Sequence, residues 1–210
     1  TGGAGYATVF VTNLNDSGAG SLREALSAGN RIIKFSVSGT ITFTNQINPP
    51  GSNITLDGTS APGSGITLKG WPLVWDRGNS NVIVRGLRFR DQDRPGTGDS
   101  MTLRGGSHHF LIDHCSFSDA TDGSLDMVYG VHDVTIQWSI LGTQNPAAEE
   151  HVSEIGINSN RVSVHHNLFW EGVQRHPQAG DSQNQDTLPH PLTADVRNNL
   201  VWAPTQGLYG

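Results

Sequence analysis

The feature that most constrains the fold of this chain is a repeated nine-residue pattern. Six segments can be written one above another so that apolar residues occupy their second and fourth positions; they begin at Asn53, Asn81, His109, Asp133, Arg161 and Thr193. In the last five segments the ninth residue is also apolar: Phe89, Phe117, Leu141, Phe169 and Val201. The starts differ by 28, 28, 24, 28 and 32 residues. A repeat of this length is typical of solenoid proteins, in which each unit packs only against its neighbours.

The repeats and the composition together predict strands rather than helices. The chain has 210 residues, of which 26 are glycine and only 15% are charged. Apolar and polar residues alternate in each repeat, as in a strand with one buried face. Shorter strands precede three repeats, at "SMTLRG", "SLDMVYG" and "SEIGINS". Such short strands bury their apolar faces only by stacking, so we expect an all-β chain folded as a parallel β-helix of about six coils.

The N-terminal segment contains the signature of one short helix. In "GSLREAL", Ser21 is followed three residues later by Glu24, which is the spacing of a capping box. We expect this helix to cover the open end of the β-helix. The alternative is that the helix packs against one side of the β-helix. The chain is therefore interpreted as a single domain, with residues 1–30 as an N-terminal cap and residues 31–210 as coils.

Charge and composition exclude several classes of function. The formal net charge is −6 and only 13 residues are Lys or Arg, which argues against nucleic-acid binding. No apolar run reaches the length of a membrane span, so we expect no membrane insertion. The single cysteine, Cys115, excludes an internal disulfide. The first residues lack the pattern of a signal peptide, as in a mature secreted protein, and we expect a secreted monomer.

Three aspartates are predicted to come together on neighbouring coils. Asp122 and Asp126 follow the repeat that begins at His109, and Asp99 holds the corresponding place one repeat earlier. Like charges at such spacing repel unless a cation lies among them. Calcium accepts carboxylate oxygens without strict geometry, and zinc would need His or Cys ligands at a spacing that is absent here. We therefore predict a Ca²⁺ site; the alternative is that the aspartates only cap turns.

Two further polar residues fall in the same sector of the repeat. His151 and Arg175 hold comparable positions in the following two units. The irregular insertions of the chain, such as "RDQDRPGTGD" and "GTQNPAAEEHV", fall there too. In repeat proteins this is often the functional face.

Several motifs resemble those of a known family. "HHFLIDHCSFSDATDGSLDM", "VTIQWSIL", "VSVHHNLFWEGVQRHP" and "VRNNLV" are similar to motifs of the pectate lyases of polysaccharide lyase family 1, and the similarity extends over nearly the whole chain. The resemblance implies a right-handed parallel β-helix with calcium at Asp99, Asp122 and Asp126. It also implies that Arg175 is the catalytic arginine and that Asp113 of "IDH" is structural.

The resemblance further implies cleavage of polygalacturonate by β-elimination, which removes the C5 proton beside a uronate carboxylate and leaves a 4,5-unsaturated product. Calcium would neutralise that carboxylate. The group that takes the proton stays open among Arg175, hydroxide and the imidazole of His176. His151, a further catalytic candidate, stands where many members have a lysine, and Gly180 stands where a second arginine often occurs. The chain also stops short of most members.

The remaining candidates are residues that could contact the substrate. Arg88, Arg90 and Arg94 could bind uronates, and Trp170 could stack on a sugar ring. Asn167 and Asn199 are interpreted as a ladder of hydrogen-bonded turns. Two other functions stay open: a non-catalytic polysaccharide-binding β-helix protein, and a β-helix glycoside hydrolase acting on pectin. The hydrolase is disfavoured because the clustered "DD", "GHG" and "RxK" motifs are absent.

Overall fold

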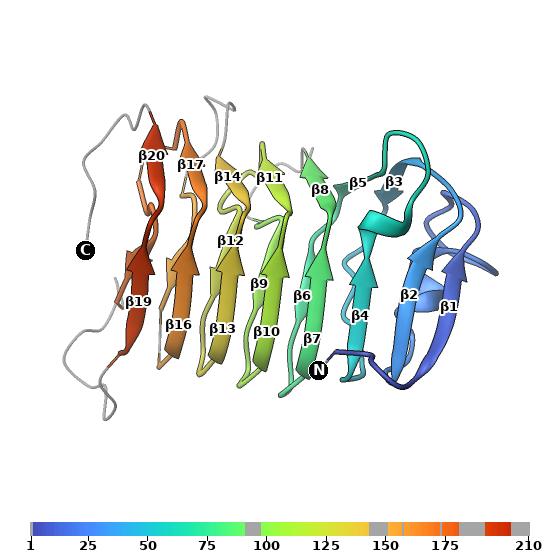
Figure 1. Cartoon of the computed structure of the whole chain (residues 1–210), viewed down its shortest axis with the longest axis horizontal. Coiled ribbons are helices and arrows are strands. Elements are labelled where there is room, and N and C mark those ends of the chain that lie inside the picture. The colour runs from blue at the N-terminus through green and yellow to red at the C-terminus, as the bar shows by residue number, and fades with distance from the viewer. Residues whose placement is uncertain are drawn as a thin grey trace.

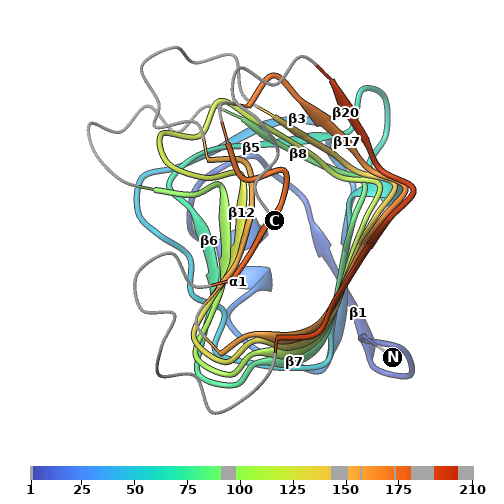
Figure 2. The same cartoon turned by 90° about the vertical axis from the view of Figure 1, so that its left-hand side faces the viewer.

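Three parallel sheets wind around one apolar core (Figure 1). The structure, a computed structural model, describes residues 2–90, 98–142, 151–156, 158–172, 174–180 and 192–202. Successive strands of the chain join the sheets in turn, so that strands of neighbouring coils lie side by side. Figure 2, viewed along the stack, shows the superposed sheets as the sides of one coil. The prediction of an all-β parallel β-helix is confirmed.

The strands of the described residues are grouped as follows. The first sheet has eight strands, in the order β1 (Ala7–Val11), β2 (Arg31–Phe35), β4 (Ile54–Asp57), β7 (Ser80–Arg85), β10 (His108–Asp113), β13 (His132–Gln137), β16 (Asn160–His165) and β19 (Ala194–Arg197). The second has seven: β3 (Gly39–Phe43), β5 (Ile66–Gly70), β8 (Leu87–Arg90), β11 (Ser116–Ser118), β14 (Ile140–Gly142), β17 (Leu168–Trp170) and β20 (Leu200–Trp202). The third has five: β6 (Leu73–Trp75), β9 (Met101–Leu103), β12 (Leu125–Met127), β15 (Glu154–Ile155) and β18 (Gln178–Ala179).

The register of the sheets is the repeat that the sequence predicts. Phe110 on β10 pairs with Val82 on β7 and with Val134 on β13. In the second sheet Phe117 pairs with Phe89, and their rings stack with centroids 4.6 Å apart and planes 10° apart. These side chains are buried because the alternation of each strand turns them toward the interior. The apolar ladders therefore form the core.

The first residue of each main repeat turns the chain into the first sheet. Asn81, His109 and Asp133 have φ of 58°, 55° and 55°, in the left-handed region that Asn, Asp and His adopt more readily than most residues. Arg161 has φ of 49° at the same place, and its guanidinium is paired with Asp133 on the preceding coil, with Nε 2.6 Å from Oδ1. Of the six repeats, all but the one that begins at Thr193 thus start with the same local turn.

Polar groups at another corner are satisfied along the stack. Asn167 Oδ1 accepts the backbone N–H of Ser139 at 2.9 Å, and Asn167 Nδ2 donates to the carbonyl of Ile136 at 3.0 Å. Asn199 repeats the arrangement one coil later by accepting the N–H of Asn167 at 2.9 Å. The predicted asparagine ladder is confirmed.

The N-terminal segment contributes both a helix and a strand. Helix α1 (Leu22–Ala25) is a single turn, and a 3-10 turn, η1, covers Gly58–Ser60. Ser21 Oγ accepts the N–H of Glu24 at 3.2 Å, but Glu24 Oε2 accepts the N–H of Gly20 at 2.6 Å, one residue before the N-cap. Figure 2 shows α1 within the outline of the coils, with Leu22 fully buried. Strand β1 lies inside the segment predicted as a cap and extends the first sheet. No helix in the described part is long and apolar enough to cross a membrane.

Candidate active site

The outer face of the third sheet carries a row of polar side chains. On β12, Leu125 and Met127 turn into the core and are fully buried, so the residue between them, Asp126, faces outward. On the next coil Ile155 is fully buried and pairs with Met127, which places Glu154 beside Asp126. Each of these two carboxylate residues is only 8% exposed. The sheet therefore holds two acidic side chains next to each other, largely out of water.

Asp99 joins this pair from the preceding coil. Its Oδ1 accepts the backbone N–H of Gly123 at 3.1 Å, and its Oδ2 accepts the hydroxyl of Thr102 at 2.7 Å. A carbon placed as a Cβ on Gly123 would lie 2.8 Å from Asp99 Oδ1 and 3.2 Å from Asp126 Oδ1. The absent side chain of Gly123 thus leaves a small space that two carboxylates face.

Asp122 lies close by, but its carboxylate is directed to a histidine. Asp122 Oδ1 is 3.3 Å from Nδ1 of His151, and His151 Nε2 is 2.9 Å from Nε2 of Gln174. The backbone fixes this arrangement, because His151 bridges Gly123 on one coil and Gln174 on the next. His151 is therefore held between the side chains of Asp122 and Gln174, close to Asp99 and Asp126.

Arg175 completes the site from the following coil. Its Nη1 lies 2.7 Å from Glu154 Oε2, and the two side chains are 16% and 10% exposed. The carbonyl of Arg175 accepts the N–H of Ser153 at 2.9 Å, which fixes the main chain beside this ion pair. Glu154 is a site residue that the sequence patterns do not single out. We call Asp99, Asp122, Asp126 and Glu154 together the carboxylate cluster.

The electrostatics of the cluster oppose the ionisation of its members. Burial, with a further contribution from the nearby charge of Asp122, raises the pKa of Asp99 to about 7, against the lowering effect of the Thr102 and Gly123 hydrogen bonds. Burial, together with the charges of Asp99 and Glu154, raises the pKa of Asp126 well above its usual range. The positive charge of Arg175 acts in the opposite direction on both aspartates. A cation bound among these carboxylates would favour their ionised form.

The predicted metal ligands are therefore brought together in part. Asp99 and Asp126 approach one point, whereas Asp122 is turned to His151. Within the described ranges, no group of three or more His, Cys, Asp or Glu side chains is arranged so that it could hold a metal ion. The donor set and the space beside Gly123 nevertheless suit a hard divalent cation that binds oxygen.

The side chain of His176 is buried away from the carboxylate cluster, so the catalytic role that was predicted for it needs correction. The residue is 5% exposed, and its two ring nitrogens are buried beside the backbone of Gly172. Its ring packs edge-on against Phe169 with centroids 6.3 Å apart, and burial lowers its pKa. The chain is not in a strand here: Arg175 has φ of 63°, and the residue after it turns into the core.

The predicted uronate-binding arginines are engaged with their own neighbours. Arg88 Nη1 donates to the carbonyl of Ser64 at 2.6 Å, and Arg90 Nη1 donates to the carbonyl of Ser116 at 2.9 Å. Both lie on β8 of the second sheet, which is not the sheet that carries the carboxylate cluster. Arg94 lies outside the described residues.

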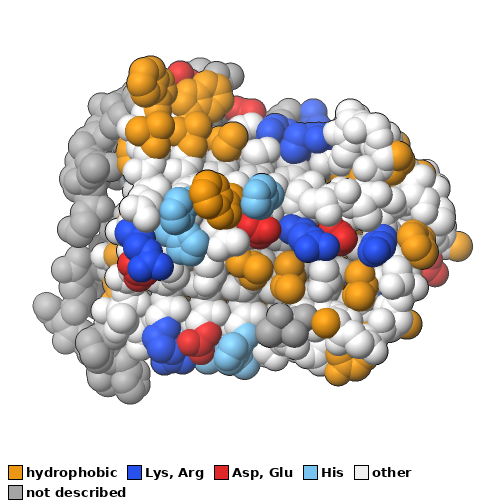
Figure 3. Space-filling view, in the orientation of Figure 1, with side chains coloured by type: hydrophobic (Ala, Val, Ile, Leu, Met, Phe, Trp, Pro, Cys, Tyr) orange, Lys and Arg blue, Asp and Glu red, His pale blue; other side chains and the backbone are white. Residues whose placement is uncertain are grey.

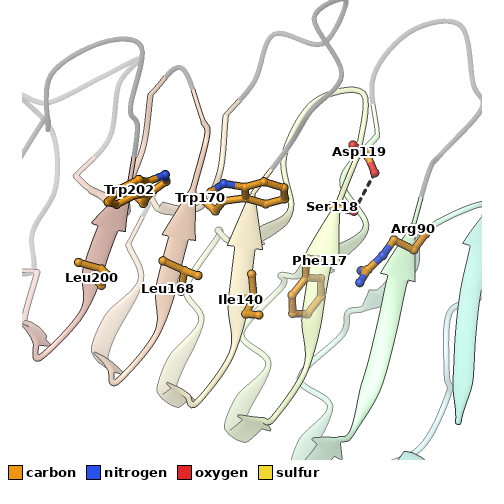
Figure 4. Close-up of a pocket in the computed structure, with 9 residues that line it drawn as sticks. All are labelled: Arg90, Phe117, Ser118, Asp119, Ile140, Leu168, Trp170, Leu200 and Trp202. Atoms are coloured by element: carbon orange, nitrogen blue, oxygen red, sulfur yellow. Dashed lines mark hydrogen bonds between the residues drawn. The ribbon is translucent and has the colours of Figure 1, made fainter. Parts of the chain in front are cut away.

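Trp170 lies in a separate, largely apolar groove on the second sheet (Figure 4). Its pair partner on β20 is Trp202, and Arg90 stands at the opposite end. The groove has a volume of about 630 Å³, and none of the described residues lining it belongs to the carboxylate cluster. Figure 3 shows apolar side chains gathered over the part of this sheet nearest the C-terminus.

The fold and the cluster define a parallel β-helix protein with an acidic site and an arginine on one sheet. No family model matches the chain. It is 36% identical over 180 residues to probable pectate lyase C of Aspergillus oryzae, an alignment that covers 84% of this chain and 41% of the fungal protein. It is 30% identical over 144 residues to probable pectate lyase 22 of Arabidopsis thaliana, covering 59% of this chain and 32% of the plant protein.

Solved structures agree on the fold. The thermostable pectate lyase PL 47 superposes with a TM-score of 0.70 at 20% identity, over 95% of this chain and 67% of the other. The cedar pollen allergen Jun a 1 superposes with a TM-score of 0.64 at 24% identity, over 85% and 59%. The chain is a homologue of proteins named pectate lyases, and it shares the parallel β-helix fold of the solved ones. It spans less than half the length of the curated relatives named above.

Proposed function

We propose that this chain carries the active site of a Ca²⁺-dependent pectate lyase, which cleaves α-1,4-polygalacturonate by β-elimination. The observation that carries the proposal is the placement of Arg175 beside Asp99, Asp126 and Glu154 on adjacent coils. It joins a cation-favouring cluster to a guanidinium, and both are needed to act on an anionic sugar. The homology to pectate lyases supports the same reaction.

Each group has a definite task in this reaction. Asp99 and Asp126, which approach one point, would hold the calcium ion, and the ion would neutralise the uronate carboxylate and so acidify the neighbouring C5 proton. Arg175 donates N–H groups and positive charge to the enediolate that develops when this proton leaves. These interactions gain strength in the transition state, which is the requirement for lowering the barrier.

We assign the proton transfer to His151. Of the two candidate histidines, His176 is buried in the core, whereas His151 lies at the edge of the carboxylate cluster. Asp122 beside Nδ1 orients the ring, and Nε2 is the atom that would take the proton once Gln174 moves aside.

The substrate and the location follow from the same chemistry. A net charge of −6 would repel polygalacturonate unless divalent cations and arginine mediate the contact. We propose an acidic polysaccharide as the partner of a monomeric protein. We also propose that the protein is secreted, because a long polymer is degraded where it is found, outside the cell.

One assay tests this function. The protein is incubated with polygalacturonate and calcium, and the ultraviolet absorbance of the 4,5-unsaturated uronate is followed. We expect product formation that chelator abolishes and that Arg175→Ala lowers by at least about 100-fold. Equal rates with and without chelator would contradict the metal's role. Retained polymer binding without product would identify a non-catalytic binding protein, and release of saturated ends would identify a hydrolase.

A further inference from the structure

The two carboxylates on the third sheet form a pair that works against the stability of the fold. Asp126 and Glu154 lie side by side on parallel strands, and both are 8% exposed. Like charges opposite each other destabilise a sheet, and burial strengthens the repulsion. The strand would be satisfied by any outward polar residue, so packing gives no reason for an acidic residue at position 154.

The contact that compensates this repulsion is the ion pair with Arg175. Nη1 of Arg175 lies 2.7 Å from Glu154 Oε2, and both side chains are mostly shielded from water. The bond from Ser153 N to the carbonyl of Arg175, at 2.9 Å, brings the two backbones together one residue away. The side chain of Glu154 therefore holds the guanidinium from the preceding coil, and the adjacent backbone bond holds the two chain segments together.

The alternative positions of Arg175 explain why such a contact matters. A free arginine side chain has many rotamers, so an unheld guanidinium samples several orientations. The charges of Asp99 and Asp126 already act on Arg175. Without Glu154 the guanidinium would be drawn toward these two aspartates and into the space beside Gly123 that suits a cation.

We propose that Glu154 is the positioning residue of Arg175: it holds the guanidinium beside the carboxylate cluster and keeps it away from Asp99 and Asp126. The inference deepens the proposed function and rests on it. Glu154 acts on the substrate only through Arg175. Its loss should thus lower kcat, because the transition-state contact is misplaced, while KM changes little.

The test compares two variants with a matched control. Glu154→Ala should lower kcat by about 100-fold and leave KM within about threefold. Glu154→Gln keeps an oxygen that can accept from Arg175 and should recover at least about tenfold of that loss. The control is Asp57→Asn, which breaks a bidentate pair with Arg85 at 2.9 Å on the first sheet. It should lower the melting temperature without changing kcat.

A double-mutant cycle separates positioning from other roles. In the background of Arg175→Lys, Glu154→Gln should cost less than a factor of three, because the residue through which it acts is already changed. Additive losses would overturn the proposal, as would unchanged kcat in Glu154→Ala.

A second measurement keeps the inference separate from the assay. Crystal structures of the wild type and Glu154→Ala should show the guanidinium displaced toward Asp99 and Asp126 in the variant. If the wild type forms no unsaturated product, the proposed function fails and these structures decide the positioning role alone. An unmoved guanidinium would overturn it.

Discussion

Glu154 and Asp126 face each other across neighbouring parallel strands, and the N–H of Glu154 donates to Asp126 Oδ1 at 2.8 Å. The backbone thus supports the carboxylate that the neighbouring side chain repels. Among the described residues of the site, Arg175 pairs directly with Glu154 and leaves Asp126 without a cationic partner at ion-pair distance. The remaining negative charge is the physical basis for the proposed cation binding.

Replacing Asp126 by Asn should separate stability from metal binding. Asparagine keeps the oxygen that accepts from Glu154 but removes one of two adjacent charges. We expect the free energy of unfolding of the metal-free protein at neutral pH to rise by up to about 1 kcal/mol. Calcium should no longer raise the melting temperature. Asp113→Asn, which alters a carboxylate bonded to Gln137 on the first sheet, serves as the control and should keep the calcium response.

The pH dependence should also change sign with calcium. The pKa of Asp99 is about 7 in the folded protein and 3.8 ordinarily, so between these values the folded state holds a proton that the unfolded state has lost. The metal-free protein should therefore be most stable at the acid end of this window and lose stability as pH rises toward 7. Calcium requires the ionised carboxylate and should bind more tightly as pH rises. Melting temperatures at about pH 5 and about pH 8, with and without calcium, check this. A metal-free protein that is more stable at the higher pH would contradict it.

The sequence was sufficient to predict the register of the coils, because the spacing of apolar residues determines which residues pair. Phe89, Phe117 and Leu141 align in the sequence at the positions where they pair in the sheet. The same comparison failed by one residue in the third sheet, where aligning Ser153 with Ser124 hid the partner of Asp126. In the structure Ser153 Oγ bonds the carbonyl of Leu125 at 2.6 Å. Since side chains alternate, a slip of one residue reverses the face of every side chain in the strand.

Other site predictions depended on three-dimensional information. Spacing places His176 beside Arg175, but adjacent residues can face opposite ways, and only packing shows that the imidazole turns inward. Trp170 follows a core position by one residue and belongs to the outer face of the second sheet. Sequence patterns locate a sector of the coil, whereas the orientation of each side chain within it depends on the backbone.

Truncating a core side chain should lower the free energy of unfolding by the usual cost of forming a cavity. Phe117 is 1% exposed and stacks on Phe89 in the middle of the β-helix. Phe117→Ala should lower the free energy of unfolding by about 3–5 kcal/mol, because neighbouring coils cannot close the cavity without losing their register. Denaturant titration measures the change. A loss below about 1 kcal/mol would show that the ladder repacks freely.

His176→Phe tests the assignment of His176 to the core. The ring is buried against Phe169, and its nitrogens lie beside the backbone of Gly172 rather than beside another ionisable side chain. A benzene ring of similar shape should therefore keep the free energy of unfolding within about 1 kcal/mol and leave kcat within a factor of about two. A loss of kcat at unchanged stability would restore a catalytic role for this imidazole.

Gly123→Ala tests the space between the carboxylates most directly. The new carbon would lie 2.8 Å from Asp99 Oδ1 and 3.2 Å from Asp126 Oδ1, so the carboxylates must separate or the space is filled. We expect weaker calcium binding, by about tenfold or more, and a matching loss of activity at limiting calcium. Gly98→Ala is the matched control, because its Cβ would meet no atom of the described residues within 4 Å. Calorimetric titration of both variants measures the affinities. If Gly123→Ala bound calcium as the control does, the ion would have to lie elsewhere, and the cluster beside Gly123 would lose its assigned role.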